Sequence, residues 1–261
     1  MGCMLSENLL AERIKAYWES PATVSLRDPN LRQLEIETVA SLLSPEDCVL
    51  DIGCGDGQGT VAYARMVRSI LGIDHSARMV SEAEQRRRDA DAPNARFIRG
   101  DLFNLSALCD GEQFDRVITE RCLINLPGWE EQQEAIRVLA RVLKPNGAYL
   151  MCETTLEGAE KLNALRARVG LEGIPIPWHN KPFAEDRLFP FLEKRFHLRD
   201  RIDFGLYYFL SRVINPLLGT PDNPIYDVRI DEVARRISSL ISMTELRGVG
   251  PITVLHLKKK G

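Results

Sequence analysis

One short stretch of the chain combines glycines with acidic side chains and could bind a charged ligand. An apolar run over residues 48–52 contains Asp51, and glycines follow at positions 53, 55, 57 and 59. A backbone that must turn sharply and let a ligand touch it cannot carry a Cβ atom, which explains the glycines. A phosphate prefers a helix N-terminus free of competing anions, whereas Asp51 and Asp56 would repel it. The stretch therefore favours a ligand with ammonium or sulfonium charge.

Two further acids follow apolar segments and indicate a nucleoside ligand. Residues 68–74 end in Asp74, and residues 95–102 end in Gly-Asp-Leu, which includes Asp101 and Leu102. An acid at the end of a second strand can accept hydrogen bonds from both ribose hydroxyls. Asp101 could accept a hydrogen bond from an adenine amino group, with Leu102 against the ring.

An open α/β sheet would bring these residues together. The glycine turn follows a strand-like run and precedes residues 60–67, whose apolar side chains recur with helical spacing. Ligands of such sheets bind in the crevice beyond the carboxyl ends of the strands. We predict strands at 47–52, 69–74, 95–99, 114–119 and 147–154, with helices at 57–67, 76–90, 103–109 and 130–143.

Five blocks together resemble the S-adenosylmethionine (SAM) dependent methyltransferases of the Rossmann-like class, class I. The blocks are LDIGCGDGQGT, LGIDHS, FIRGDL, FDRVIT and RVLARVLKPNGAYL, which occur in order between about residues 46 and 155. The resemblance implies an α/β fold with a doubly wound, seven-stranded, mostly parallel sheet whose last strand is antiparallel. It also implies helices on both faces, a helical cap insertion, SAM as cofactor and S-adenosylhomocysteine (SAH) as product.

On this resemblance, Asp51 and the glycine backbone would hold the methionine end of SAM, and Asp74 would hold the ribose. His75 would border the ribose or the adenine. The predicted cofactor contacts are Asp51, Gly53, Cys54, Gly55, Gly57, Asp74, His75, Asp101, Leu102 and Glu120.

Two segments supply candidate catalytic groups. Glu120 and Arg121 directly follow an apolar strand, so we expect them at the pocket mouth, where Arg121 either binds an anionic group of the substrate or pairs with Glu120. Two prolines stiffen residues 175–180, in which Trp178 offers a stacking surface and His179 a base that titrates near neutral pH. We predict that His179, or else Glu120, removes the acceptor proton.

Further substrate contacts are expected from outside the core. Helices over residues 6–19, beginning at Ser6, and over residues 31–43, started by Asp28 or Asn30, would help to enclose the site, as such segments do in the resembling family. Arg32 is then a further candidate to face the SAM carboxylate or the substrate. Insertions at 156–182 and 205–250 would form a lid or cap, because long segments inside a compact domain are usually functional or disordered and these contain aromatic residues. The predicted substrate contacts are Tyr17, Arg27, Arg121, Asn125, Trp178, His179, Tyr207 and Arg212.

Four parts of the chain follow from these assignments. Residues 1–45 would be a helical segment over the cofactor site, and residues 46–155 the SAM-binding core. Residues 156–250 would hold the cap insertions, interleaved with a sixth strand, and residues 251–261 the last strand of the sheet.

Composition limits the expected partners. The formal net charge of −3 gives no electrostatic reason for a nucleic-acid partner. Six cysteines lie without C-x-x-C spacing, which argues against a metal site and is typical of reduced, cytoplasmic thiols. No signal-like segment begins the chain, and no apolar run approaches the ~20 residues of a membrane span. We expect a cytoplasmic monomer or homodimer acting on a small molecule.

The leading hypothesis is methyl transfer to an oxygen or nitrogen of a small biosynthetic intermediate, such as a sugar or natural product. A NAD-type oxidoreductase shares the strand, the glycines and the acid, so it stays an alternative. A non-catalytic SAM-binding module is the third possibility. Methylation of nucleic acid is disfavoured, because Glu-Arg-Cys-Leu stands at 120–123 where resembling amine-directed DNA enzymes carry Asn-Pro-Pro-Tyr.

Overall fold

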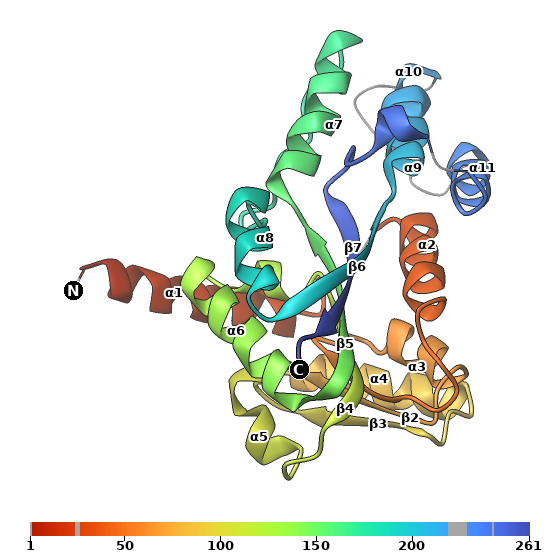
Figure 1. The fold of residues 1–261 in the computed structure, drawn as a ribbon. Helices are drawn as coiled ribbons and strands as arrows, with labels where there is room; N and C mark the ends of the chain where they lie inside the picture. Colours follow the sequence, from red (N-terminus) through yellow and green to blue (C-terminus); the bar gives the residue numbers. More distant parts are fainter. Residues whose placement is uncertain (1, 24–26, 219–228, 242) are drawn as a thin grey trace.

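A single seven-stranded sheet forms the centre of the molecule (Figure 1). The computed structural model describes residues 2–23, 27–218, 229–241 and 243–261. The strand order is β3-β2-β1-β4-β5-β7-β6. The strands are β1 (Cys48–Ile52), β2 (Ser69–Asp74), β3 (Ala95–Arg99), β4 (Phe114–Glu120), β5 (Leu143–Thr154), β6 (Phe196–Asp203) and β7 (Ile252–Lys259).

The direction of the strands agrees with the fold class expected from the sequence. Strands β1 to β5 pair in parallel, and β7 lies antiparallel between β5 and β6. The doubly wound sheet with an antiparallel last strand is therefore confirmed. Since the parallel strands share one direction, the segments after β1, β2, β3 and β4 meet along one edge of the sheet.

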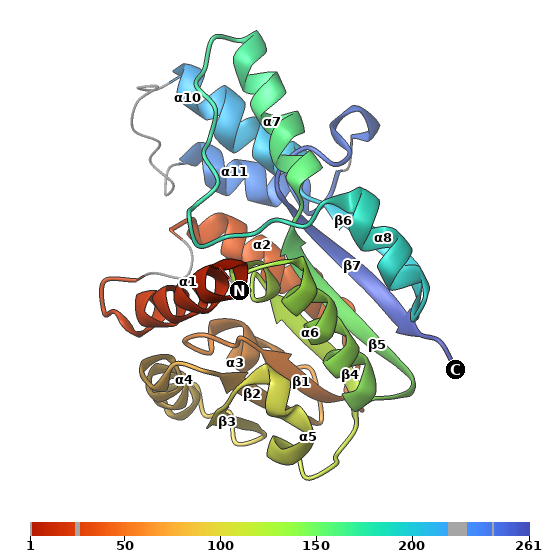
Figure 2. The same ribbon diagram turned by 90° about the vertical axis from the view of Figure 1, so that its left-hand side faces the viewer.

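Helices cover both faces, as Figures 1 and 2 show. One face packs against α2, α3, α4 and α9, and the other against α5, α6 and α8, in two separate apolar clusters. The helices are α1 (Gly2–Glu19), α2 (Pro29–Ala40), α3 (Gln58–Ala64), α4 (Ala77–Asp89), α5 (Leu105–Leu108), α6 (Trp129–Val142), α7 (Leu156–Arg168), α8 (Glu185–Glu193), α9 (Gly205–Phe209), α10 (Asn215–Leu218) and α11 (Arg229–Ser238).

Short helical turns complete the described chain. They are the 3₁₀ turns η1 (Leu102–Asn104), η2 (Leu123–Asn125) and η4 (Thr244–Leu246), and the π-helical turn η3 (Leu210–Ile214). Within the described residues, no helix is both long and apolar enough to cross a lipid bilayer.

Most differences from the predicted elements concern boundaries. Helix α1 begins at Gly2 instead of Ser6, and β5 begins at Leu143. Helix α2 does begin after Asp28, whose Oδ1 accepts a hydrogen bond from the Leu31 amide at 2.9 Å, as expected of a helix cap. The Pro/Gly-rich stretch at 216–224, for which the sequence predicts a turn, lies largely outside the described residues.

Candidate active site

A cavity of about 340 Å³ lies at the carboxyl edge of the parallel strands. The glycine turn, η1, the loop after β4, α1 and residues 179–180 all contribute to its lining. The predicted site residues that line it are Gly53, Gly55, Asp74, His75, Asp101, Leu102, Glu120, Arg121, Asn125 and His179.

The acid after β2 has a fixed orientation in this cavity. Asp74 accepts hydrogen bonds from the Gly55 amide at 3.0 Å and the Ser76 amide at 2.9 Å, one on each carboxylate oxygen. Gly55 has a φ of 55°, and no heavy atom lies within 4 Å of the position that a Cβ would take. The glycine turn therefore leaves open space beside an oriented carboxylate, as close approach of a ligand requires.

The neighbouring groups also suit a nucleoside. The Nε2 atom of His75 is buried and has no hydrogen-bond partner among the described residues. Asp101 caps η1 through the Phe103 amide at 3.0 Å, and apolar Met79, Leu102 and Phe103 line the same region. Carboxylates, an unpaired imidazole nitrogen and apolar surfaces together fit ribose hydroxyls and a flat base.

Three residues predicted to contact the cofactor lie outside the lining: Asp51, Cys54 and Gly57. Asp51 is 2% exposed, and its carboxylate accepts a hydrogen bond from the Thr60 hydroxyl. Burial and the nearby Glu120 carboxylate raise the pKa of Asp51 to about 7. Asp51 thus links β1 to α3 across the glycine turn, through Thr60. Because Asp51 does not line the cavity, its contact with the methionine end of SAM stays a prediction.

Glu120 reaches the cavity as part of a buried ion-pair network. Arg32 donates to both of its carboxylate oxygens, at 2.7 and 3.1 Å, and the Tyr63 hydroxyl donates at 3.0 Å. Although burial opposes ionisation, the Arg32 guanidinium lowers the pKa of Glu120. A Cβ at Gly59 would lie 2.6 Å from Arg32 Nη2 and 2.7 Å from Glu120 Oε2, so this fourth glycine makes room for the ion pair.

Arg121 pairs with Glu35 of α2, which corrects the predicted alternative of a pair with Glu120. Both hydrogen bonds leave from Nη1, at 2.8 and 3.0 Å, and Glu35 is fully buried. Burial raises the pKa of Glu35 despite its two arginine partners. Arg121 has a φ of 52°, an uncommon conformation for a residue with a Cβ, which the surrounding contacts must maintain.

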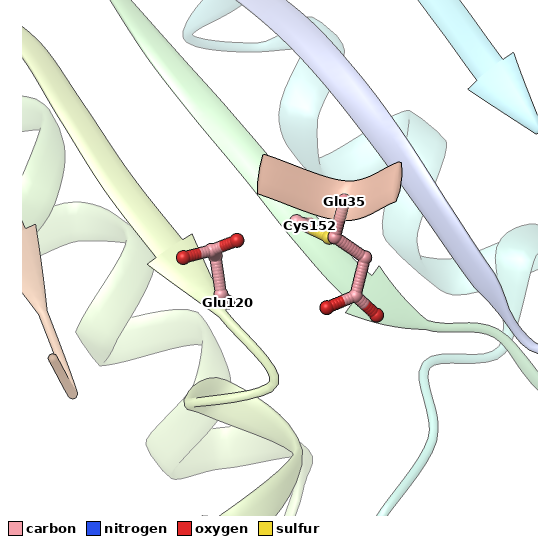
Figure 3. A group of neighbouring side chains, drawn as sticks. All are labelled: Glu35, Glu120 and Cys152. Atoms are coloured by element: carbon pink, nitrogen blue, oxygen red, sulfur yellow. The ribbon is translucent and has the colours of Figure 1, made fainter. Parts of the chain in front are cut away.

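Glu35, Glu120 and Cys152 could offer ligand atoms to a metal ion, since these atoms lie within 4.8 Å of one another (Figure 3). Both carboxylates, however, are held by arginine side chains. Burial also raises the pKa of the Cys152 thiol well above its usual value. Because a cation would have to displace two guanidinium groups, we assign this cluster to the ion-pair network.

Aromatic rings surround His179 on the other side of the cavity. Its ring stacks on Tyr17 at 4.5 Å between centroids, and Trp18 and Trp178 meet it edge-on at 5.8 and 5.5 Å. The Nδ1 atom of His179 is buried without a partner among the described residues, and burial lowers the pKa of the imidazole. Tyr17 and Trp178 do not line the cavity, so they support His179 in place of the predicted substrate contact.

Asn125 is held beside this aromatic group. Its side-chain oxygen accepts a hydrogen bond from Trp18 Nε1 at 3.3 Å, and its Nδ2 donates to the Arg121 carbonyl at 2.7 Å. Helix α1 is thereby tied to the loop after β4, and both border the cavity that Trp18 lines.

The remaining substrate predictions do not converge on this cavity. Tyr207 donates to Asp28 at 2.8 and 2.9 Å, and Arg212 pairs with the same carboxylate. All three are buried, because the α9–η3 segment packs on the start of α2. Arg27 is exposed away from the lining, and none of the described residues between 205 and 250 lines the cavity.

Sequence reasoning missed Trp18, Glu35 and Tyr63, and it gave Arg32 no partner. The signal available was modest: an arginine and a glutamate three residues apart among the buried positions of α2. Charged side chains on a helix usually face water, so the spacing alone did not indicate partners on β4.

Comparison with known proteins agrees with the fold. A family model described as a methyltransferase domain matches residues 49–147, from β1 into β5. The Bacillus subtilis (strain 168) protein named "Uncharacterized methyltransferase YcgJ" is 30% identical over 124 residues, covering 46% of this chain and 47% of that protein. The chain spans about half the length of the curated relatives it matches.

Two solved structures share the fold over nearly the whole chain. The N-methyltransferase NodS from Bradyrhizobium japonicum WM9, in complex with SAH, has a TM-score of 0.60 at 15% identity, covering 97% of this chain and 99% of that one. Magnesium protoporphyrin IX methyltransferase (ChlM) from Synechocystis PCC 6803, with bound SAH, has a TM-score of 0.58 at 18% identity, covering 98% and 99%. The two structures show that the chain shares their fold, and the family model makes residues 49–147, less than half of the chain, similar to a methyltransferase domain.

Proposed function

We propose that this chain transfers a methyl group from SAM to an oxygen or nitrogen of a small biosynthetic intermediate, such as a sugar or natural product. The observation that carries the proposal is the order of charged groups along the sheet edge. Asp74 and Glu120 end β2 and β4, Asp101 and Arg121 lie just beyond β3 and β4, and all four line one cavity. Its volume, about 340 Å³, lies within the range of small-molecule sites.

The residues fit both ends of SAM. Asp74 and Asp101 offer oriented oxygens to ribose and adenine, and the open space at Gly55 allows close approach. At the other end, the ionised Glu120 suits the α-ammonium group. Arg121 uses only Nη1 for Glu35 among the described contacts, which leaves donors that suit the α-carboxylate.

Methyl transfer from SAM requires little of the protein beyond positioning of the acceptor. When bound, SAM supplies a methyl group on a sulfonium, whose leaving group is neutral and needs no general acid. The protein must hold the acceptor atom in line and close, and must exclude water. Trp18, Asn125 and His179 border the cavity from α1, the loop after β4 and the 173–182 segment, so they suit both tasks.

We assign removal of the acceptor proton to His179. Because burial lowers its pKa, the imidazole is neutral near pH 7 and able to accept a proton. Glu120, the other predicted base, fits this role less well, since Arg32 and Tyr63 already occupy its oxygens.

The domain division at 1–45, 46–155, 156–250 and 251–261 belongs to the same proposal. The cavity-lining residues of α1, together with His179 and Asn180, support a covering role for residues 1–45 and for the 156–182 insertion. The absence of nucleic-acid, metal and membrane partners, the cytoplasmic location and a monomer or homodimer stay predictions from the sequence.

Calorimetric titration with SAM, SAH and NAD tests the proposal. Binding of SAM and SAH without NAD is expected, and binding of NAD alone would support the oxidoreductase alternative. SAH release in an acceptor screen then separates an enzyme from a non-catalytic SAM-binding module, because the module would bind SAM and release no SAH with any acceptor.

A further inference from the structure

The loop after β4 (residues 122–127) is held by hydrogen bonds to one buried carboxylate. Glu153 of β5 is 1% exposed, and its oxygens accept hydrogen bonds from three consecutive amides: Cys122 at 3.1 Å, Leu123 at 2.9 Å and Ile124 at 3.4 Å. Successive amides that point at one anion fix the backbone between them. The shape of this loop, which lines the cavity, therefore depends on a residue that does not line it.

The carbonyl groups of the same loop hold the segment that carries His179. The Lys181 amide donates to the Ile124 carbonyl at 2.6 Å. The side-chain amide of Gln132, 3% exposed on α6, donates to the Leu123 carbonyl at 3.2 Å and the Lys181 carbonyl at 2.8 Å. Gln132 thus joins the two segments two residues away from His179.

These contacts form one chain of hydrogen bonds from the sheet to the imidazole segment. Glu153 accepts hydrogen bonds from the amides of the loop. The carbonyls of the loop hold Lys181, directly at Ile124 and through Gln132 at Leu123. Glu153, Gln132, Leu123 and Ile124 are buried, so loss of a partner there leaves an unsatisfied donor or acceptor that favours rearrangement. Displacement of a catalytic group by about 1 Å can lower a rate about 100-fold.

We propose that Glu153 and Gln132 are positioning residues that set the place of His179 at the methyl-transfer site. This inference rests on the proposed function of the site. Neither residue touches the cavity, so both act through the loop after β4 and the segment that ends at Lys181.

The variant Gln132→Leu tests the proposal most directly. It removes both bridging hydrogen bonds and leaves the Glu153 contacts intact. Gln133→Leu is the matched control, because Gln133 is half-buried on the same helix and makes none of these hydrogen bonds. The pair Glu153→Gln and Glu153→Leu tests the other end, since glutamine keeps one acceptor oxygen and leucine keeps none.

Imidazole NMR provides a readout that needs no acceptor. The chain has four histidines, so four Hε1 resonances are expected, and His179→Ala assigns that of His179. The His179 resonance should shift in Gln132→Leu and Glu153→Leu, shift less in Glu153→Gln, and stay in place in Gln133→Leu. In Gln132→Leu the His75 resonance should stay in place, and the Kd for SAM should change less than twofold.

The outcomes separate this inference from the proposed function. An unchanged His179 resonance in folded Gln132→Leu protein overturns the positioning role, even where the melting temperature falls. Failure of the wild-type protein to bind SAM counts against the proposed function and leaves the resonance test intact. Should Glu153→Leu not fold, Gln132→Leu decides alone. With an acceptor found by SAH release, kcat of Gln132→Leu should fall about 10- to 100-fold.

Discussion

Arg121 forms its ion pair with Glu35 of α2, 86 positions away in the chain, and not with Glu120 beside it. The pair joins the end of β4 to a helix that precedes the whole sheet in sequence. Arg32, one turn earlier on α2, makes the second connection, to Glu120. Helix α2 is thus fixed by two ion pairs to the residues at which we place the methionine end of SAM.

Removal of Glu35 should destabilise the protein strongly. In Glu35→Ala the largely buried Arg121 side chain loses its partner, and breaking a buried pair typically costs about 3–5 kcal/mol. Urea unfolding of Glu35→Ala, Arg121→Ala and the double variant measures this loss and the coupling between the residues. We expect the double variant to be more stable than the sum of the single losses predicts. Additive losses would contradict the pairing.

Asp74→Asn should weaken SAM and SAH binding without unfolding the protein. A charge-assisted hydrogen bond contributes about 1.5–3 kcal/mol, so the Kd should rise about 10- to 100-fold in calorimetry. Asp56→Asn is the control, because Asp56 belongs to the same glycine turn but faces outward to Arg86 at 2.6 Å. Equal weakening by both variants would show that charge in the turn matters in general, and not contact with the ribose.

His179→Ala should lower turnover by about 100-fold or more if the acceptor is a hydroxyl. Because burial lowers the pKa of His179, the wild-type rate should rise with pH through a midpoint below 6.5 and then level off. The variant should lose this rise and keep its Kd for SAM. Undiminished turnover of His179→Ala would remove the imidazole from the mechanism.

The sequence predicted local features of this protein better than its long-range partners. The glycine turn, the acids after β2 and β3, and the cap at Asp28 are set by neighbours in the chain, and all appear where expected. The partners of Arg121 and Tyr207 depend on how α2 packs between distant segments. A single sequence holds no local signal for such packing, so it could not reveal Glu35 as the partner of Arg121, and the predicted pair with Glu120 was wrong. Nor could it reveal Asp28 as the partner of Tyr207.

Asp51 illustrates a second limit. An acid at the end of the first strand suggested contact with the ligand, yet its carboxylate is buried against Thr60. The spacing of the motif correctly indicated an acid beside the turn. Which way its side chain points depends on the hydroxyl of Thr60 on α3, on the other side of the turn.

Glu153 should make the protein less stable as the pH rises. Burial raises its pKa from 4.5 to about 7, so between these values the folded protein holds a proton that the unfolded chain releases. The resulting contribution to the free energy of unfolding is therefore present below about pH 4.5 and is lost as the pH rises through about 7. Glu153→Gln cannot titrate there, whereas all other groups titrate in both proteins. Urea unfolding at pH 5 and pH 8 should therefore show that the wild-type protein loses about 1–3 kcal/mol more than the variant. An equal loss in both proteins would mean that Glu153 keeps its ordinary pKa, with its three amide contacts offsetting the cost of burial.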